Sequence, residues 1–161
     1  MPGELDDRPT ARDDVLPAAA RYCFACGDDN PIGLHLDDIR RVGEEVLATL
    51  RPRPEYQGYP GVLHGGLSAT ALDEVMGYAA ILLAGVWAAT ATMDLRYRAQ
   101  VPYHAPLPLV AGLRDARGRR VRAWGRLHLP DGRVGAEATG LLVALPAELA
   151  ERARALYGPM T

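Results

Sequence analysis

The feature that most constrains the fold of this chain is a long apolar segment near its middle, "LSATALDEVMGYAAILLA", which runs from Leu67 to Ala84. Its apolar residues occupy nearly every face of a helix, which is typical of a helix buried on most sides. The longest apolar stretch, Val75 to Ala91, is rich in alanine and is interrupted by Gly77 and Gly85. It therefore predicts a buried helix rather than a membrane span, and the simplest partner is a sheet that wraps around it.

Short stretches typical of β-strands lie on both sides of this segment. The triplet "RVG" at 41–43 separates two strand-like runs and predicts a hairpin. After the helix, apolar and polar residues alternate with the period of a half-buried strand, and "PDGR" at 130–133 marks a turn. We expect strands at residues 90–98, 108–115, 120–129 and 134–145, and a short helix at 146–158 with Pro at its start and Gly at its end. The predicted fold class is α+β, with about six antiparallel strands around one long helix.

The size and charge of the chain limit its class further. Its 161 residues suit one domain, and we expect a flexible tail over residues 1–20 and a single domain over residues 21–161. A net charge of −2 does not indicate nucleic acid as the main partner. The first twenty residues lack the apolar core of a signal peptide and there are only two cysteines, so we expect a cytoplasmic protein that has no membrane partner.

Two glycines and two acids make the long helix a candidate site. Gly65 and Gly66 precede the apolar run, where a helix start presents unpaired N–H groups and a partial positive charge. Glycine lets a substrate approach that backbone closely, which suits a developing oxyanion. Asp73 and Glu74 follow about two turns later, and a carboxylate facing the same space could act as general base or nucleophile. These residues alone are equally compatible with a tight turn and two acids that have structural partners.

The segment "GVLHGGLSATALDEVMGYAA" resembles the hotdog-fold acyl-CoA thioesterases, in particular the PaaI-like branch of the 4-hydroxybenzoyl-CoA thioesterase superfamily. The shared pattern is His-Gly-Gly followed by Asp nine residues after the His, and the upstream "CFACGDDNPIGL" is also similar to that family. The resemblance spans about Tyr22 to Leu145. It implies a curved antiparallel sheet around one long helix. It also implies homodimers that often pair into homotetramers, with the active site at the subunit interface.

The resemblance also implies a role for each candidate residue. The Gly65 N–H would polarise the thioester carbonyl of one substrate, and Asp73 of the other subunit would attack that carbonyl or activate water. His64 is a candidate general base, although we favour a role in fixing the turn or contacting substrate. The expected substrate contacts are Gly66, Gln57, Glu74, Thr90 and Thr92. Gln57 stands one residue from the place where related enzymes carry Asn or Gln, and the two threonines lie on the strand after the helix.

Two other motifs carry possible chemistry. Cys23-x-x-Cys26 fits half a zinc site or a redox pair, but a structural zinc needs four ligands and the chain has no second cysteine pair. We therefore expect reduced structural thiols and no metal, with a site shared between subunits as the alternative. The arginine-rich segment 117–126 could bind the phosphates of coenzyme A. Its strict alternation is equally typical of a solvated strand face, which is the interpretation we favour.

The sequence therefore predicts an acyl-CoA thioester hydrolase that releases a free acid and coenzyme A. The expected substrate is an acyl-CoA or acyl-carrier thioester, and no cofactor is expected because coenzyme A is part of the substrate. One alternative is a non-catalytic hotdog protein that binds acyl-CoA or another small ligand. A second is a hotdog enoyl hydratase or dehydratase, which usually pairs a catalytic His with an acid in a motif that this chain lacks.

Overall fold

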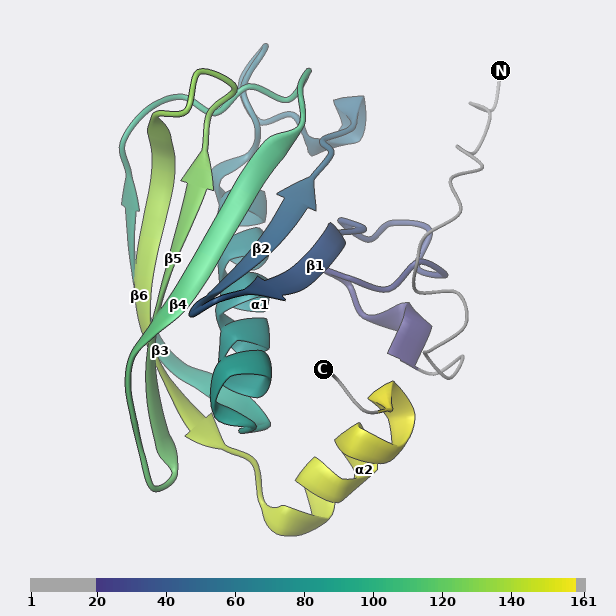
Figure 1. Cartoon of the computed structure of the whole chain (residues 1–161). Helices are drawn as coiled ribbons and strands as arrows, with labels where there is room; N and C mark the ends of the chain where they lie inside the picture. The colour runs from purple at the N-terminus through teal and green to yellow at the C-terminus, as the bar shows by residue number, and fades with distance from the viewer. Residues whose placement is uncertain (1–19, 159–161) are drawn as a thin grey trace.

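The computed structural model describes residues 20–158, so residues 1–19 of the predicted tail lie outside the described part. A curved sheet wraps around one long helix, and a shorter helix follows the last strand (Figure 1). The elements in chain order are β1 (Asp37–Val42), β2 (Glu45–Leu50), α1 (Gly65–Ala84), β3 (Ala88–Tyr97), β4 (Leu107–Arg117), β5 (Arg120–His128), β6 (Val134–Ala144) and α2 (Ala147–Tyr157).

The sheet has six strands in the order β1-β2-β4-β5-β6-β3, and every neighbouring pair is antiparallel. β1 and β2 form the predicted hairpin, in which Gly43 occupies the turn at a φ of +62° that favours glycine. β5 and β6 form the hairpin around the predicted "PDGR" turn. β1 and β3 are the two edge strands, and β3 is paired only with β6 among the described residues.

α1 is buried as its apolar composition predicts. It contacts all six strands and presents buried residues on several faces, among them Leu72, Val75, Met76 and Ala79. The helix has the length and mean hydropathy of a membrane span, a property that the core helix of a soluble protein shares. Eight of its residues are buried in the protein core, so burial against the sheet accounts for its composition.

The predicted strands and helices are confirmed with small shifts at their ends. α1 begins at Gly65, two residues before the predicted start, because the side chain of His64 caps it. β5 shows the predicted alternation: Val121, Ala123, Gly125 and Leu127 are buried, and the residues that alternate with them are exposed or partly exposed. The α+β hotdog arrangement is therefore confirmed.

β3 departs from simple alternation. Its pairing with β6 shifts register between Thr90 and Thr92, which makes Ala91 a bulge. Met93 and Leu95 are partly buried, but Tyr97 is 55% exposed. β3 is therefore a bulged edge strand that exposes apolar side chains.

Candidate functional site

Asp73 is held by the edge strand that follows its helix. The Thr90 hydroxyl of β3 donates a hydrogen bond of 2.6 Å to Oδ1 of Asp73 on α1. Both side chains remain accessible to solvent. A charge-assisted hydrogen bond of this length fixes the orientation of a carboxylate and leaves its second oxygen available for water or substrate.

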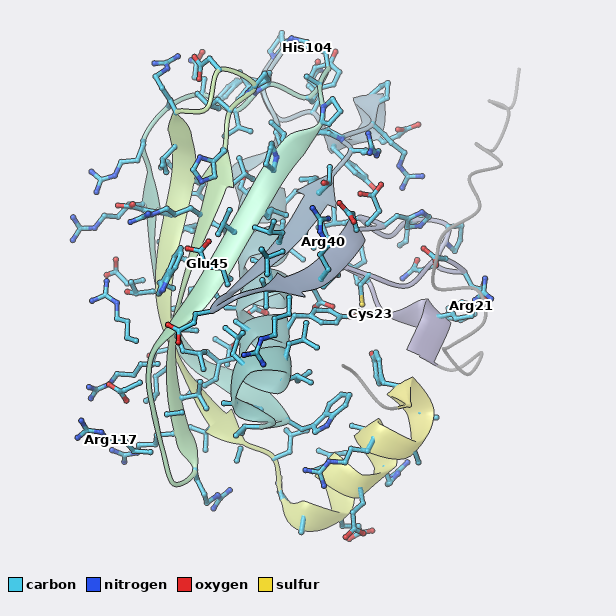
Figure 2. The ribbon with its side chains drawn as sticks, viewed as in Figure 1. Arg21, Cys23, Arg40, Glu45, His104 and Arg117 are labelled. Carbon is cyan, nitrogen blue, oxygen red and sulfur yellow. The ribbon has the colours of Figure 1, made fainter. Side chains whose placement is uncertain are left out.

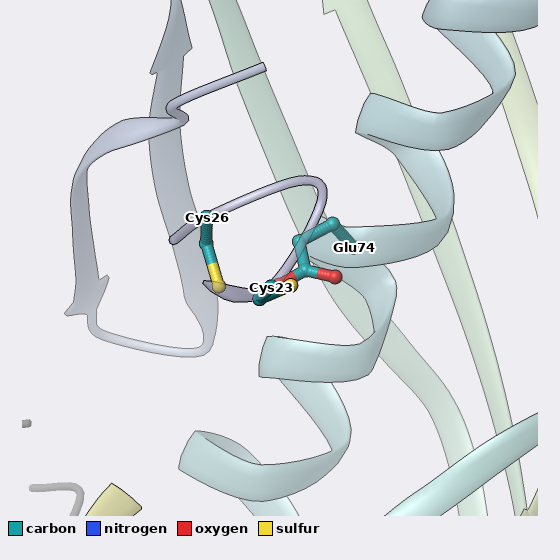
Figure 3. A group of neighbouring side chains, drawn as sticks. All are labelled: Cys23, Cys26 and Glu74. Atoms are coloured by element: carbon teal, nitrogen blue, oxygen red, sulfur yellow. The ribbon is translucent and has the colours of Figure 1, made fainter. Parts of the chain in front are cut away.

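Glu74 points into a different environment from Asp73, although the two are adjacent in the chain. Its carboxylate faces Cys23 and Cys26 of the N-terminal segment, and the Cys23 thiol donates to Oε1 of Glu74 at 3.5 Å (Figure 3). Burial, together with negative charge at Cys23, raises the pKa of Glu74 to about 7. The geometry thus separates two acids that the sequence leaves as rivals.

The two thiols beside Glu74 differ in acidity. A hydrogen bond with the Cys26 thiol, together with backbone hydrogen bonds from Cys26 and Ala25, lowers the pKa of Cys23 to about 5. The same thiol pairing and burial raise the pKa of Cys26. Cys23 is partly buried and Cys26 is buried, and the two are not joined by a disulfide.

His64 forms the N-cap of α1. Its Nδ1 accepts a hydrogen bond of 3.0 Å from the Gly66 N–H, so Nδ1 carries no proton and the neutral ring carries its proton on Nε2. A ring in this state caps the helix and has no free basic nitrogen. This geometry supports the turn-fixing role over the general-base role.

The backbone N–H of Gly65, at the start of α1, is available to donate a hydrogen bond to a ligand. The N–H of Leu67 is bonded to the His64 carbonyl, whereas no described residue accepts a hydrogen bond from the Gly65 N–H. The side chain of Tyr97 lies against Gly65 and donates from its hydroxyl to the Gly65 carbonyl at 2.8 Å. A Cβ at Gly65 would stand 3.2 Å from the Tyr97 ring, so a larger residue there would require the ring or the helix start to shift. No pattern in the sequence links Tyr97 to Gly65, which lies 32 residues earlier in the chain.

A pocket of about 830 Å³ opens in front of the helix start. Gln57, His64, Gly65 and Gly66 line it together with Tyr97. Gln57 is exposed, and its Oε1 accepts from the Gly61 N–H at 3.3 Å, so it also braces the loop. Four of the predicted site residues are therefore brought to one cavity.

Asp73 and Thr90 do not line this pocket. Eight residues separate Gly65 from Asp73 on α1, which corresponds to about 12 Å along the helix axis. This span is too long for both groups to reach one thioester carbonyl. A single chain thus carries two half-sites, one with the amide donor and one with the carboxylate.

The remaining candidates have other surroundings. Thr92 is exposed on β3 beyond the bulge, and within the described part of the chain only Thr90 bonds to Asp73. In the arginine-rich segment, Arg122 lies 3.5 Å from Asp115, and Arg126 stacks over the Trp124 ring at 5.1 Å. Arg117 points away from the body of the protein at the end of β4 (Figure 2). These arginines belong to the solvated strand face that the alternation predicts.

A sheet wrapped around a central helix, with an amide donor at the helix start and a carboxylate in its middle, defines a hotdog protein of the thioesterase class. Residues 60–136 match the family model of the thioesterase superfamily. Over these residues the chain is similar to that superfamily.

Several solved structures share the fold of this chain. A thioesterase superfamily protein is 28% identical, with a TM-score of 0.71 over 86% of this chain and 74% of that chain. A Streptococcus mutans protein bound to acetyl CoA is 18% identical, with a TM-score of 0.64 over 68% of this chain and 88% of that one. A hypothetical thioesterase of Streptococcus pneumoniae with coenzyme A is 19% identical, with a TM-score of 0.62 over 67% of this chain and 84% of that one.

Proposed function

We propose that this protein hydrolyses acyl-CoA thioesters and releases a free acid and coenzyme A. The observation that carries the proposal is the Asp73–Thr90 pair, an oriented and accessible carboxylate in the middle of the central helix. The unpaired Gly65 N–H beside an 830 Å³ pocket supplies the second element that thioester hydrolysis needs. Similarity to the thioesterase superfamily supports the same reaction class.

Similar proteins support coenzyme A as the carrier. The Streptococcus mutans structure holds acetyl CoA and the Streptococcus pneumoniae structure holds coenzyme A. Two variants of a hypothetical thioesterase from Streptococcus pneumoniae have also been solved, one with an Asp and one with a Thr replaced by Ala. In that protein the replaced Asp and Thr are 16 positions apart in the sequence. Asp73 and Thr90 of this chain are 17 positions apart. We take these two as the equivalent pair.

We propose that the working unit is a homodimer joined near the open edge of β3. The ten residues of this strand have no partner on one side among the described residues, and a long open edge favours pairing with another chain. In such a dimer, Gly65 of the second copy would lie near Asp73 of the first copy. The two groups would then act on one thioester carbonyl, although about 12 Å of helix separates them within one chain. The PaaI-like branch, in which the resemblance implies such an interface, is the affiliation we propose.

The reaction follows from these two half-sites. The Gly65 N–H of one subunit donates to the thioester oxygen and stabilises the negative charge that develops there. Asp73 of the other subunit removes a proton from a water molecule, and that water forms a bond to the carbonyl carbon. The carbon–sulfur bond then breaks, and the coenzyme A thiolate leaves and takes up a proton. Thr90 holds Asp73 in position for the proton transfer.

Release of free thiol from a panel of thioesters tests this function. The panel includes short-chain, long-chain and aryl acyl-CoAs, one enoyl-CoA and one acyl-carrier-protein thioester, each with wild-type protein and Asp73→Asn. We expect thiol release by the wild type and its loss in the variant. Tight binding without thiol release across the panel would favour the ligand-binding alternative, and water addition to the enoyl-CoA would favour the hydratase.

A further inference from the structure

Three potential metal ligands converge beside the central helix, outside the proposed thioester site. Cys23, Cys26 and Glu74 each offer one ligand atom, and these three atoms lie within 4.8 Å of one another (Figure 3). Two of the residues come from the N-terminal segment and the third from α1. From this geometry we propose that the three side chains bind one zinc ion, which fastens the N-terminal segment to the central helix.

The chemistry of the three donors fits this ion. Zinc is bound in proteins by cysteine sulfur at about 2.3 Å and by carboxylate oxygen at about 2.0–2.2 Å. Ligand atoms around one such ion lie roughly 3.5–4 Å apart in a tetrahedral arrangement, and the 4.8 Å limit includes that spacing. The C-x-x-C spacing is also the spacing common in structural zinc sites. The sequence predicts no metal because it shows only half a site, and the fold supplies the third ligand from a residue 51 positions after Cys23.

The turn that carries the cysteines is shaped for two sulfur ligands. The Gly27 N–H bonds to the Cys23 carbonyl at 2.9 Å, and the backbone N–H groups of Ala25 and Cys26 bond to the Cys23 sulfur. A Cβ at Gly27 would stand 2.2 Å from the Arg21 carbonyl oxygen, so only glycine allows the chain to close here. Amide donors of this kind stabilise a thiolate that ligates a metal.

The Tyr78 hydroxyl of α1 supports the buried ligand Cys26. It donates to the Cys26 sulfur at 3.3 Å and can orient it from outside the ligand set. Tyr157 of α2 packs on the Trp87 ring, with 5.4 Å between ring centroids, and burial together with negative charge at Cys23 raises its pKa. Water would complete the coordination of a tetrahedral zinc at the fourth position.

A disulfide fits the same cysteines less well. The Cys23 sulfur and the Glu74 carboxyl group now share a hydrogen bond. Oxidation of the pair would weaken that contact and leave the partly buried carboxyl group beside an apolar S–S bond, which is unfavourable. A zinc ion uses both sulfurs and the carboxylate together. The observations thus favour a metal over a redox pair.

The zinc would be structural and would take no part in the thioester chemistry. Glu74 points away from the Asp73–Thr90 pair, and none of the three ligands lines the pocket at Gly65. The ion would link segment 20–36 to α1 across a part of the protein that the sheet does not cover. Its presence is therefore tested by metal content and stability, independently of thioesterase activity.

Metal analysis of the purified full chain tests the proposal directly. We expect about one zinc per chain by mass spectrometry after expression in zinc-supplemented medium, and lower thermal stability after removal of zinc by a chelator. Replacement by Co²⁺ should give the near-ultraviolet absorption of thiolate-to-cobalt charge transfer. Cys23→Ser, Cys26→Ser and Glu74→Gln should each weaken zinc binding at least about tenfold. Glu44→Gln, an exposed acid in the β1–β2 turn, is the matched control and should bind zinc like the wild type.

Three experimental results would contradict the proposed zinc site. A wild-type chain that binds neither Zn²⁺ nor Co²⁺ at micromolar concentration, with both thiols free to react, would overturn the proposal. A mass deficit of two hydrogens and no bound metal would overturn it in favour of a disulfide. Equal loss of zinc in Glu44→Gln and Glu74→Gln would also contradict it. If the cysteine variants fail to fold, the cobalt spectrum of the wild type and the metal content of Glu74→Gln still decide the question.

Discussion

The Thr90 hydroxyl donates a 2.6 Å hydrogen bond to the Asp73 carboxylate and thereby joins the edge strand to the central helix at the proposed active site. The bond fixes one carboxylate oxygen and leaves the other for water. Because Glu74 on the same helix faces the two cysteines instead, the proposed function depends directly on Asp73.

Asp73→Asn should lower kcat for acyl-CoA hydrolysis by about 10²- to 10⁴-fold, because the amide cannot accept a proton from water. The amide keeps the size of the side chain and can still accept from Thr90, so the fold and the dimer should persist. Thiol-release kinetics give the rate, and circular dichroism with size-exclusion chromatography verifies the fold. Near wild-type hydrolysis by this variant would exclude Asp73 as the base.

Thr90→Val should reduce kcat/KM by about 10- to 100-fold, because a hydrogen bond to a charged group contributes roughly 1.5–3 kcal/mol and its loss lets the carboxylate rotate. Thr92→Val is the matched control, since Thr92 lies on the same exposed strand and makes no bond to Asp73. The two variants are compared by steady-state kinetics on one acyl-CoA. A larger loss of kcat/KM in Thr92→Val than in Thr90→Val would contradict the assignment of the positioning role to Thr90.

Glu74→Gln should reduce kcat less than Asp73→Asn does, because the Glu74 carboxylate faces two thiols rather than the open edge of the sheet. Parallel measurement of kcat for the two variants under saturating substrate checks this order. A reversed order would move the base from Asp73 to Glu74.

The fold was predictable because its main signals are local. The apolar composition of α1 and the period-two pattern of β5 survive in the structure almost residue for residue. The two half-sites were predictable only in part. The family resemblance offers Thr90 and Thr92 as equal candidates on the strand after the helix, and only the structure shows that Thr90 bonds to Asp73. The contact of Glu74 with Cys23 joins residues 51 positions apart and leaves no periodic signal in the sequence. Tyr97 was missed for the same reason, since its contact with Gly65 is set by the β3 edge and not by alternation.

Gly65→Ala should lower kcat/KM by about 10- to 100-fold, because a misplacement of about 1 Å at a reacting group can cost that much. The new Cβ would stand 3.2 Å from the Tyr97 ring and would displace either the ring or the helix start that carries the amide donor. Gly77→Ala is the control for glycine replacement in the same helix. Its Cβ meets no atom within 4 Å, and we expect a gain of about 0.5–1 kcal/mol in unfolding free energy. Equal activity of Gly65→Ala and wild type would remove Gly65 from the proposed site.

Tyr56→Phe tests the loop that supports the pocket. The buried Tyr56 hydroxyl donates to the Gly33 carbonyl and accepts from Arg53, and burial raises its pKa. Since Arg53 also donates to that carbonyl at 2.8 Å, the carbonyl keeps a partner in the variant, and we expect a loss of about 1 kcal/mol at neutral pH.

The raised pKa also sets how this contribution depends on pH. Below about pH 10 the phenol is protonated in both the folded and the unfolded chain, so its contribution to stability is complete. As the pH rises further, the unfolded chain loses the proton first, and the contribution falls until the folded phenol also ionises. Urea unfolding from neutral pH to about pH 11 should therefore show a steeper loss of stability in the wild type than in Tyr56→Phe. Tyr59→Phe, at a position that is 83% exposed, should follow the wild-type curve, and a shallower alkaline slope in that variant instead would contradict the assignment to Tyr56.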